Sequence, residues 1–318
     1  MKTEYVKYAV SLAFIVLLGF AVYSSSFGGE FIWDDIAFVR DNELIKSWAN
    51  AGKIFTVDSA KSLAPGGGAV RYNFYRPLHI LSLMADYSLW KLNTFGYHLT
   101  NVIFHVLAAI ALFWLVMIIF KDRLLASLTA CLFVVHPVHT EAVAFISGRA
   151  DPMSLAFLLF AFVFYIKCQK TGSPAFMIPA IVAYALAILS RETSAILPVL
   201  LLLYHVTSKK KIKLAPYLSI AVITLAHIIF RVSMAKHLLS ADRVPSIAGA
   251  IERMPGFFVA VTKYLSILFM PFGLHMEYGN PSFTFMNPKA LFGLVLTFFL
   301  LAEAIRRRKE NGLIFFSV

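Results

Sequence analysis

Apolar residues fill most of this chain in long runs that short polar connections separate. The runs cover residues 5–23, 98–120, 124–135, 153–166, 174–189, 195–206, 214–230, 254–272 and 288–305. Several of them approach the roughly 20 residues that an α-helix needs to cross a hydrocarbon core about 30 Å thick. In composition, 59% of the residues are hydrophobic and only 14% are charged. The pattern predicts an all-α polytopic membrane protein built as a helical bundle.

Clusters of basic residues beside the runs predict which helix ends face the cytoplasm. The net charge of +12 is concentrated in short groups near the N-terminus and at residues 121–123, 209–213 and 306–309. Such groups mark cytoplasmic helix ends. If the run 254–272 crossed the membrane, the last basic group would lie outside, so we interpret that run as an interfacial or re-entrant helix. The positive charge therefore indicates topology, and we expect no nucleic-acid partner.

We expect one transmembrane domain over residues 1–318 with two long external connections. The first external loop covers residues 24–97, and apolar residues at helical spacing within 78–92 predict an amphipathic interfacial helix there. The second covers 232–287 and carries the other interfacial helix. No small-residue cleavage site follows the first run, which we interpret as a retained signal-anchor helix. Residues 312–318 open another apolar run, so we expect a truncated chain that lacks at least one further helix.

With this topology, ionisable residues from several separate connections fall on the external side. They are Asp34, Asp35, Arg76, His79, His136, His139, Glu141, Arg149, Asp151, Arg191, Glu192 and Glu277. Ionisable groups held close to hydrocarbon cost free energy unless they are paired or functional. Their convergence on one face predicts a shared polar cavity at the external ends of the helices.

The adjacent acids Asp34 and Asp35 follow the first helix at the level where it leaves the membrane. An acid there is well placed to act on a substrate that is half lipid and half polar. Transfer of a sugar from a polyprenyl phosphate needs one carboxylate to accept the proton of the attacking hydroxyl. It also needs positive charge beside the leaving phosphate, which Arg76, Arg149 or Arg191 would supply. The residues thus favour a membrane glycosyltransferase over two alternatives, a transporter or flippase of lipid-linked sugars and a non-catalytic membrane subunit.

Five groups of residues carry a resemblance to a known family. They are residues 31–35 with 41–42, then 75–78, 136–143, 147–151 and 190–193. In this order they resemble the membrane domain of the transmembrane and tetratricopeptide-repeat O-mannosyltransferases and their bacterial relatives, within the GT-C superfamily. Residue 191 is Arg where the family commonly has Lys, which keeps the charge and alters its geometry. No tetratricopeptide repeat occurs in these residues.

The resemblance implies a GT-C-like fold and inverting transfer of a sugar, such as mannose, from a polyprenyl-phosphate donor to a protein hydroxyl or a glycolipid. The active site would face the bacterial periplasm or the lumen of the endoplasmic reticulum. An acidic residue of the first external loop would be the base, which by position is Asp34 or Asp35. The remaining candidates for binding the donor phosphate and substrate are Arg76, His79, His139, Glu141, Arg149, Asp151, Arg191, Glu192 and Glu277.

Several candidates also have a structural interpretation. Asp34 and Asp35 would cap a helix or lie in a solvated loop. Arg76 would precede the interfacial helix, because a following Pro suits a first helical turn. Salt bridges are the alternative roles for Arg149 with Asp151 and for Arg191 with Glu192.

Metal binding is a further alternative at the segment that contains His136, His139 and Glu141. These side chains are of the types that bind zinc, but no motif fixes a third ligand at the spacing of known sites. We therefore assign no metal ligand and no certain cofactor. A divalent metal stays an alternative means of holding the donor phosphate.

Overall fold

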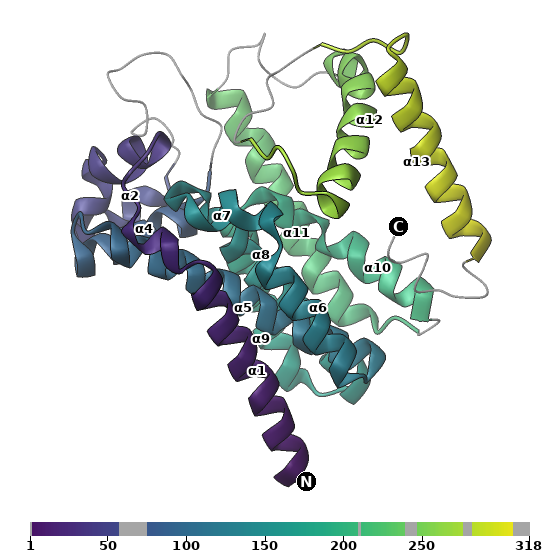
Figure 1. Cartoon of the computed structure of the whole chain (residues 1–318), viewed down its shortest axis with the longest axis horizontal. Coiled ribbons are helices and arrows are strands. Elements are labelled where there is room, and N and C mark those ends of the chain that lie inside the picture. The colour runs from purple at the N-terminus through teal and green to yellow at the C-terminus, as the bar shows by residue number, and fades with distance from the viewer. Residues whose placement is uncertain (1, 57–74, 209–210, 239–246, 276–281, 308–318) are drawn as a thin grey trace. The chain divides into compact units, whose positions relative to one another are not determined.

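The computed structural model describes residues 2–56, 75–208, 211–238, 247–275 and 282–307 (Figure 1). These residues form helices and turns without a strand among them. The predicted fold class, an all-α protein, is confirmed for this part of the chain. Glu277, one of the candidate site residues, lies outside the described residues.

The chain divides into two compact units. Unit 1 comprises Met1–Pro198 and Lys213–Leu238, and unit 2 comprises Val199–Ile212 and Leu239–Val318. Every candidate site residue except Glu277 belongs to unit 1. The site is therefore a property of a single unit.

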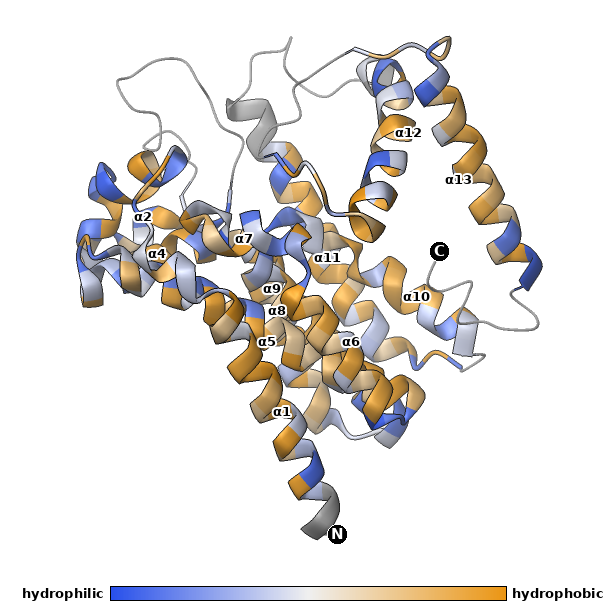
Figure 2. Ribbon diagram, in the orientation of Figure 1, coloured by the Kyte–Doolittle hydropathy of each residue, from blue (hydrophilic) through white to orange (hydrophobic). Residues whose placement is uncertain are grey.

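The apolar runs of unit 1 fold into helices whose bounds lie close to those that the sequence predicts. They are α1 (Lys2–Val22), α5 (Thr94–Phe120), α6 (Arg123–Val135), α8 (Ala150–Thr171), α9 (Met177–Ser190) and α11 (Leu214–Leu238). Figure 2 shows that α1, α5 and α6 are hydrophobic along most of their length, whereas hydrophilic residues gather around the short helices α2 (Ala51–Ile54) and α7 (Thr140–Ala144).

The number of long apolar helices confirms the prediction of a multi-pass membrane protein. Across both units, the described residues contain 5 helices that are long and apolar enough to cross a membrane. Helix α6 and the segment Pro137–Ala144 are bent by 49° relative to each other, and they add a sixth span if they are counted together as one. The bend falls at Pro137, which has no N–H to continue the helical hydrogen bonds of α6. After it come the 3-10 turn η6 (Pro137–His139) and the short helix α7 (Thr140–Ala144).

Polar caps end the spans of unit 1 and set the tight turn between α5 and α6. The Asn93 side chain accepts a hydrogen bond from the Phe95 N–H at 3.1 Å, which caps the start of α5. At the other end, Lys121 adopts a left-handed backbone with φ of 59°. Asp122 Oδ1 then accepts from the Leu125 N–H at 3.0 Å and caps α6. Because only these two residues separate the helices, α5 and α6 form a helical hairpin.

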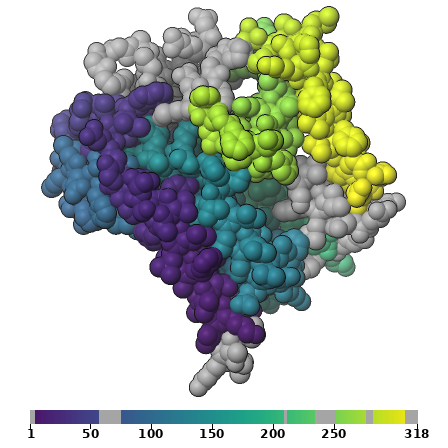
Figure 3. Space-filling view, in the orientation of Figure 1, coloured from purple at the N-terminus to yellow at the C-terminus, as the bar shows by residue number. Residues whose placement is uncertain are grey.

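Helix α1 packs on this hairpin. Ile15 is fully buried in a cluster with Ala109 and Phe113 of α5 and with Ala126 of α6. Gly19 allows the close approach, since an added Cβ would lie only 2.5 Å from Val106 Cγ2. In the space-filling view α1, in purple, lies along the face of unit 1 beside α6 (Figure 3).

The chain between α1 and α5, here called the first loop, folds into short helices of its own. They are η1 (Ser24–Gly28), the π-helical turn η2 (Ile36–Arg40), η3 (Glu43–Lys46), η4 (Trp48–Asn50), α2 (Ala51–Ile54) and α4 (Pro77–Trp90). The amphipathic helix predicted within 78–92 is α4, and Pro77 is its first residue.

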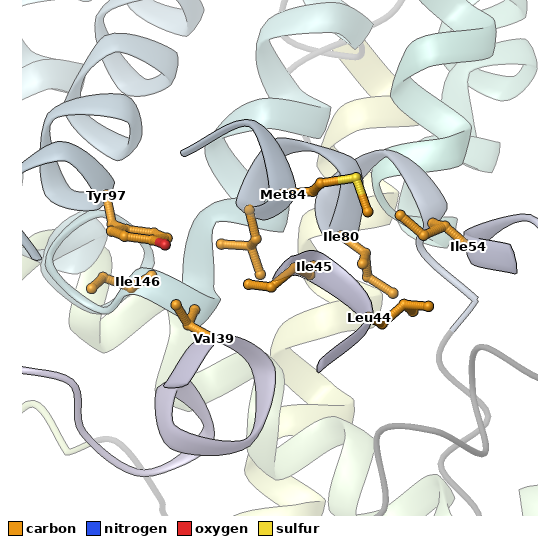
Figure 4. Close-up of a cluster of buried hydrophobic side chains, with 9 residues drawn as sticks. Val39, Leu44, Ile45, Ile54, Ile80, Met84, Tyr97 and Ile146 are labelled. Carbon is orange, nitrogen blue, oxygen red and sulfur yellow. The ribbon is translucent and has the colours of Figure 1, made fainter. Parts of the chain in front are cut away.

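A hydrophobic core holds the first loop against the helices of unit 1. Val39, Ile45 and Ile54 from the short helices pack with Ile80, Leu83 and Met84 from α4 (Figure 4). Tyr97 from α5 and Ile146 from the connection before α8 belong to the same cluster, and both are fully buried. Burial of side chains of this size contributes about 1.5–3 kcal/mol each. The first loop is therefore docked on the ends of α5 and α8 by packing as well as by polar contacts.

Unit 2 contains most of α10 (Leu197–Ser208), together with α12 (Ile247–Phe269) and α13 (Pro288–Arg307). Helices α12 and α13 pack so closely that a Cβ on Gly293 would lie 2.0 Å from the Phe258 carbonyl oxygen. The run 254–272 falls largely in α12. Its interfacial placement stays a prediction.

Candidate functional site

Asp35 joins the first loop to the connection that precedes α8. Its carboxylate is only 1% exposed. Oδ1 accepts hydrogen bonds from the Ser147 N–H at 2.8 Å and from the Ser147 hydroxyl at 2.6 Å. Oδ2 accepts from the Ile32 N–H at 3.2 Å. Two motifs that are far apart in the sequence thus meet at one carboxylate.

Burial raises the pKa of Asp35 above its ordinary value of 3.8. The hydrogen bonds from Ser147 and Ile32 oppose this effect because they stabilise the charged form, and the net shift is upward. The hydrogen bonds that hold Asp35 in place are therefore strongest when its carboxylate is charged.

Asp34 differs from its neighbour in almost every respect. Its side chain is exposed. It follows Trp33, which is 61% exposed and has φ of 47°, in the left-handed region that bulky residues rarely adopt. Of the two acids, Asp34 is the one that a hydroxyl from outside can reach. Asp35 makes no capping hydrogen bond through its side chain and is buried, so neither structural alternative, a helix cap or a solvated loop, describes it. Asp34 presents its carboxylate to solvent, as the solvated-loop alternative expects.

Arg149 is the most deeply buried charged residue of the site, with no exposed surface. Its Nη2 atom lies 2.5 Å from Asp86 Oδ2 and donates to the Tyr97 carbonyl at 2.9 Å. Nε donates to Asn101 Oδ1 at 2.6 Å, and Nη1 to Ser82 Oγ at 3.3 Å. The guanidinium therefore ties α4 and α5 to the start of α8.

Two more ion pairs lie in unit 1 and join different elements. Arg76, immediately before α4, donates from Nε to Glu192 Oε2 at 3.0 Å and from Nη2 to Oε1 at 2.7 Å. Arg191, after α9, pairs through Nη1 with Asp151 Oδ2 in the first turn of α8. All four side chains are partly exposed. The structure thus brings Arg76, Asp151, Arg191 and Glu192 to the same ends of the helices.

The salt bridges considered between sequence neighbours, Arg149 with Asp151 and Arg191 with Glu192, are wrong. Each of these four residues pairs with a residue of another element. The reason is geometric, because residues one or two apart in a helix or turn project in different directions. The charges hold elements together across the site.

His79 is buried within α4 at 3% exposure. Burial lowers its pKa to about 3, and the positive charges of Arg149, Arg76 and Arg191 act in the same direction. The imidazole is therefore neutral at physiological pH. Its Nε2 atom is buried and has no hydrogen-bond partner among the residues that the structure describes.

The segment with His136, His139 and Glu141 lies at the same helix ends. The His139 ring packs against Phe133 at 4.4 Å between centroids and against His105 at 5.3 Å. Glu141 is exposed at the start of α7, near enough to Asp151 and Arg191 for their charges to interact. The described residues contain no group of three or more His, Cys, Asp or Glu side chains that could hold a metal ion.

Sequence reasoning missed Asp86 and Asn101, which hold Arg149, and gave Ser147 no role. A signal for Asp86 does exist. It follows His79 by seven residues and Leu83 by three, the spacing that keeps residues on one helix face, so it stands on the apolar stripe of α4. Asn101 is likewise a polar side chain inside a predicted span, where a polar group needs a hydrogen-bond partner.

The fold and the site together define a class: a polytopic helical membrane protein in which acids and arginines from several connections meet beside a docked first loop. Comparison with known proteins makes this description more specific. The resemblance to O-mannosyltransferases that the motifs indicated is confirmed over about half the chain. The sequence is 36% identical to protein O-mannosyl-transferase TMTC1 of Mus musculus over 188 residues, which are 54% of this chain and 19% of that protein.

Two further relatives bear similar names. Identity is 34% over 155 residues to protein O-mannosyl-transferase TMTC3 of Mus musculus, covering 49% of this chain and 16% of that protein. It is 31% over 164 residues to protein O-mannosyl-transferase F38B6.6 of Caenorhabditis elegans, covering 50% and 23%. The chain spans about a fifth of the length of the curated relatives it matches. No family model and no solved structure matches it.

Proposed function

We propose that this chain is a membrane glycosyltransferase domain that transfers a sugar from a polyprenyl-phosphate donor to a hydroxyl group. The names of the relatives support mannose as the sugar and a protein as the acceptor. A glycolipid acceptor is the alternative. The site would face the periplasm of a bacterium or the lumen of the endoplasmic reticulum.

The observation that carries the proposal is the set of contacts made by residues 147–151. Ser147 binds Asp35 of the first loop, Arg149 binds Asp86 of α4, and Asp151 pairs with Arg191. One short segment thus contacts the first loop at Asp35, helix α4 at Asp86 and the residue after α9 at Arg191, which supports a site that combines a carboxylate with arginines. This is the combination that transfer from a lipid-linked sugar phosphate requires.

We assign the role of base to Asp34, because its carboxylate is exposed while that of Asp35 is buried and engaged. The acceptor oxygen forms a bond to C1 of the sugar as the bond from C1 to the phosphate oxygen breaks. The bonding electrons leave with the polyprenyl phosphate, and the hydroxyl proton passes to Asp34. A single displacement inverts the configuration at C1.

Arg76 and Arg191 are the proposed binding groups for the donor phosphate. Each guanidinium offers five N–H donors, so a carboxylate partner and a phosphate oxygen can be bound together. Glu192 and Asp151 would orient them. The neutral His79 ring, with its unpartnered Nε2, would add an uncharged hydrogen bond.

Other candidates take supporting roles in the proposal. Arg149 is fully buried and bound on every side, so we assign it to the scaffold. Glu141 is exposed beside the Asp151 and Arg191 pair and is a candidate for contacting sugar hydroxyls. A divalent metal would supply charge at the phosphate, but the described residues offer no cluster to hold one, and we derive no step through it.

The test is transfer by the purified chain in detergent, with synthetic polyprenyl-phosphate mannose and peptides that contain Ser and Thr. We expect mannosyl peptide without any membrane gradient, and a strong loss of rate in Arg191→Ala. Addition of EDTA would show whether a divalent metal is needed. Movement of the lipid-linked sugar across vesicles without any transfer would instead identify a flippase and overturn the proposal.

A further inference from the structure

One carboxylate holds both sides of the turn that carries the proposed base. Asp35 Oδ1 binds the Ser147 N–H and hydroxyl, at 2.8 and 2.6 Å. Asp35 Oδ2 binds the Ile32 N–H, immediately before Trp33, at 3.2 Å. Trp33 and Asp34 therefore lie inside a short loop that is closed by Asp35 and fixed to the connection before α8.

The backbone of this loop is strained at Trp33, whose φ is 47°. Such a conformation persists in a bulky residue only where its surroundings enforce it, and it is typical of functional sites. The Trp33 side chain is 61% exposed, so its own packing provides little of that constraint. Backbone bonds on either side contribute, from the Asp35 N–H to the Ile32 carbonyl at 2.9 Å and from the Ile36 N–H to the Trp33 carbonyl at 3.1 Å.

Fixing the loop matters for Asp34 because an exposed carboxylate on an unsupported turn would sample many positions. A general base must lie within hydrogen-bond reach of the proton that it accepts. A displacement of about 1 Å can lower a rate a hundredfold. Among the described residues outside the loop, only Ser147 donates hydrogen bonds to the Asp35 carboxylate.

We propose that Ser147 is a positioning residue that acts through Asp35 to hold the strained Trp33–Asp34 turn in its catalytic conformation. This inference rests on the proposed function, because it assigns a geometry to the proposed base. Ser147 itself touches no reacting atom. Its hydroxyl supplies one of the two bonds that fix Asp35 Oδ1, and its backbone N–H supplies the other.

The hydrogen bonds between Ser147 and Asp35 should also depend on pH. The hydrogen bonds from Ser147 lower the pKa of Asp35, while burial and the negative charge of Asp34 raise it. Among the described residues, the buried guanidinium of Arg149 is a further charge that interacts with Asp35. Removal of the Ser147 hydroxyl should therefore raise the pKa of Asp35 and release the turn at a higher pH than in the wild-type protein.

The experiment compares Ser147→Ala, Ser147→Thr and the control Ser127→Ala in the full chain, using polyprenyl-phosphate mannose and a Ser/Thr peptide. The control also removes a hydroxyl that forms a hydrogen bond, from Ser127 Oγ to Ser11 Oγ at 3.0 Å, but in α6 and α1. We expect Ser147→Ala to lower kcat about tenfold with little change in KM. The acid limb of its pH profile should move to higher pH. Ser147→Thr should restore both, and Ser127→Ala should leave both unchanged.

Two results would overturn the inference. One is a wild-type kcat and pH profile in Ser147→Ala. The other is a fall in kcat that follows a loss of thermal stability and leaves the acid limb in place, since that would mark a merely structural role. Failure of the proposed function looks different: the wild-type chain would then show no transfer, or Asp34→Asn would transfer at the full rate.

Discussion

Arg149 and Asp86 form an ion pair deep inside unit 1, with 2.5 Å between Nη2 and Oδ2 and almost no exposure of either side chain. The pair connects the start of α8 to α4, the helix that carries His79. Asp86 also accepts a hydrogen bond from the Thr100 hydroxyl at 2.8 Å. A charge this deeply buried depends on its partner, because water cannot replace the lost interaction.

Removal of Asp86 should therefore destabilise the protein strongly. We expect Asp86→Asn to lower the free energy of unfolding by about 3–5 kcal/mol, since it leaves the Arg149 charge buried and uncompensated. Unfolding of the purified protein by sodium dodecyl sulfate in mixed micelles measures the change. The matched control is Asp41→Asn, which breaks the exposed pair with Arg40 and should not change stability measurably. Equal stability of Asp86→Asn and wild type would refute this role of the pair.

A side chain at Gly148 should destabilise the protein. A Cβ there would lie 3.1 Å from the Glu141 carbonyl oxygen and 3.2 Å from Ala142 Cα, so backbone atoms would have to move. We expect Gly148→Ala to cost about 1–3 kcal/mol of stability. Gly52→Ala is the control, because no described atom lies within 4 Å of its added Cβ and Ala suits a helix better than Gly. Thermal unfolding in detergent compares the two, and a Tm for Gly148→Ala at or above that of Gly52→Ala would contradict the packing described.

The Arg76–Glu192 pair should persist far into the acid range. Burial alone would raise the pKa of Glu192, but the hydrogen bond and charge of Arg76 lower it from 4.5 to about 2. A carboxyl whose pKa is lowered on folding contributes stability above its unfolded pKa and loses it as the pH falls through the folded value. The Tm difference between wild type and Glu192→Gln should stay constant from pH 7 to about 5 and shrink between about 4.5 and 2. A difference that vanishes by pH 5 would argue against the pair.

Accessibility labelling tests whether the site lies on one side of the membrane. In a chain with Cys131 and Cys168 replaced by Ala, single cysteines at the exposed positions Trp33 and Thr193 should react with an impermeant maleimide from the same side. A cysteine at Lys121, in the turn after α5, should react only after permeabilisation. If positions 33 and 193 reacted from opposite sides, the first loop and the arginine pairs could not form one site, and the proposed site would be wrong.

Helix positions could be predicted well because hydrophobic length and polar caps are local properties. The run predicted at 98–120 is α5, Thr94–Phe120, and the extra turn at its start follows from the Asn93 cap. The run predicted at 153–166 is longer in the structure, because α8 begins at Ala150 and continues through Lys167 and Lys170 to Gly172, whose φ is 73°. A hydropathy pattern ends at the charged residues of a span, although their long stems extend along the helix.

The partners of the charged residues could not be predicted, because pairing depends on how helices pack. The convergence of external groups was expected from topology, and the structure brings Asp35 to Ser147 and Arg76 to Glu192. Nothing in the local sequence shows that Arg149 turns inward to α4 while Asp151 reaches Arg191. Nor does the pattern show that, of two adjacent acids, Asp35 is buried and Asp34 is exposed.

The most direct measurement of the central claim is the initial rate of mannose transfer by Asp34→Asn, compared with wild type at equal amounts of folded protein. If Asp34 accepts the proton of the attacking hydroxyl, the rate should fall by about 10²–10⁴-fold, while retention of polyprenyl-phosphate mannose and the Tm stay as in wild type. Transfer by Asp34→Asn at the wild-type rate would contradict the assignment of the base and, with it, the catalytic role of the first loop.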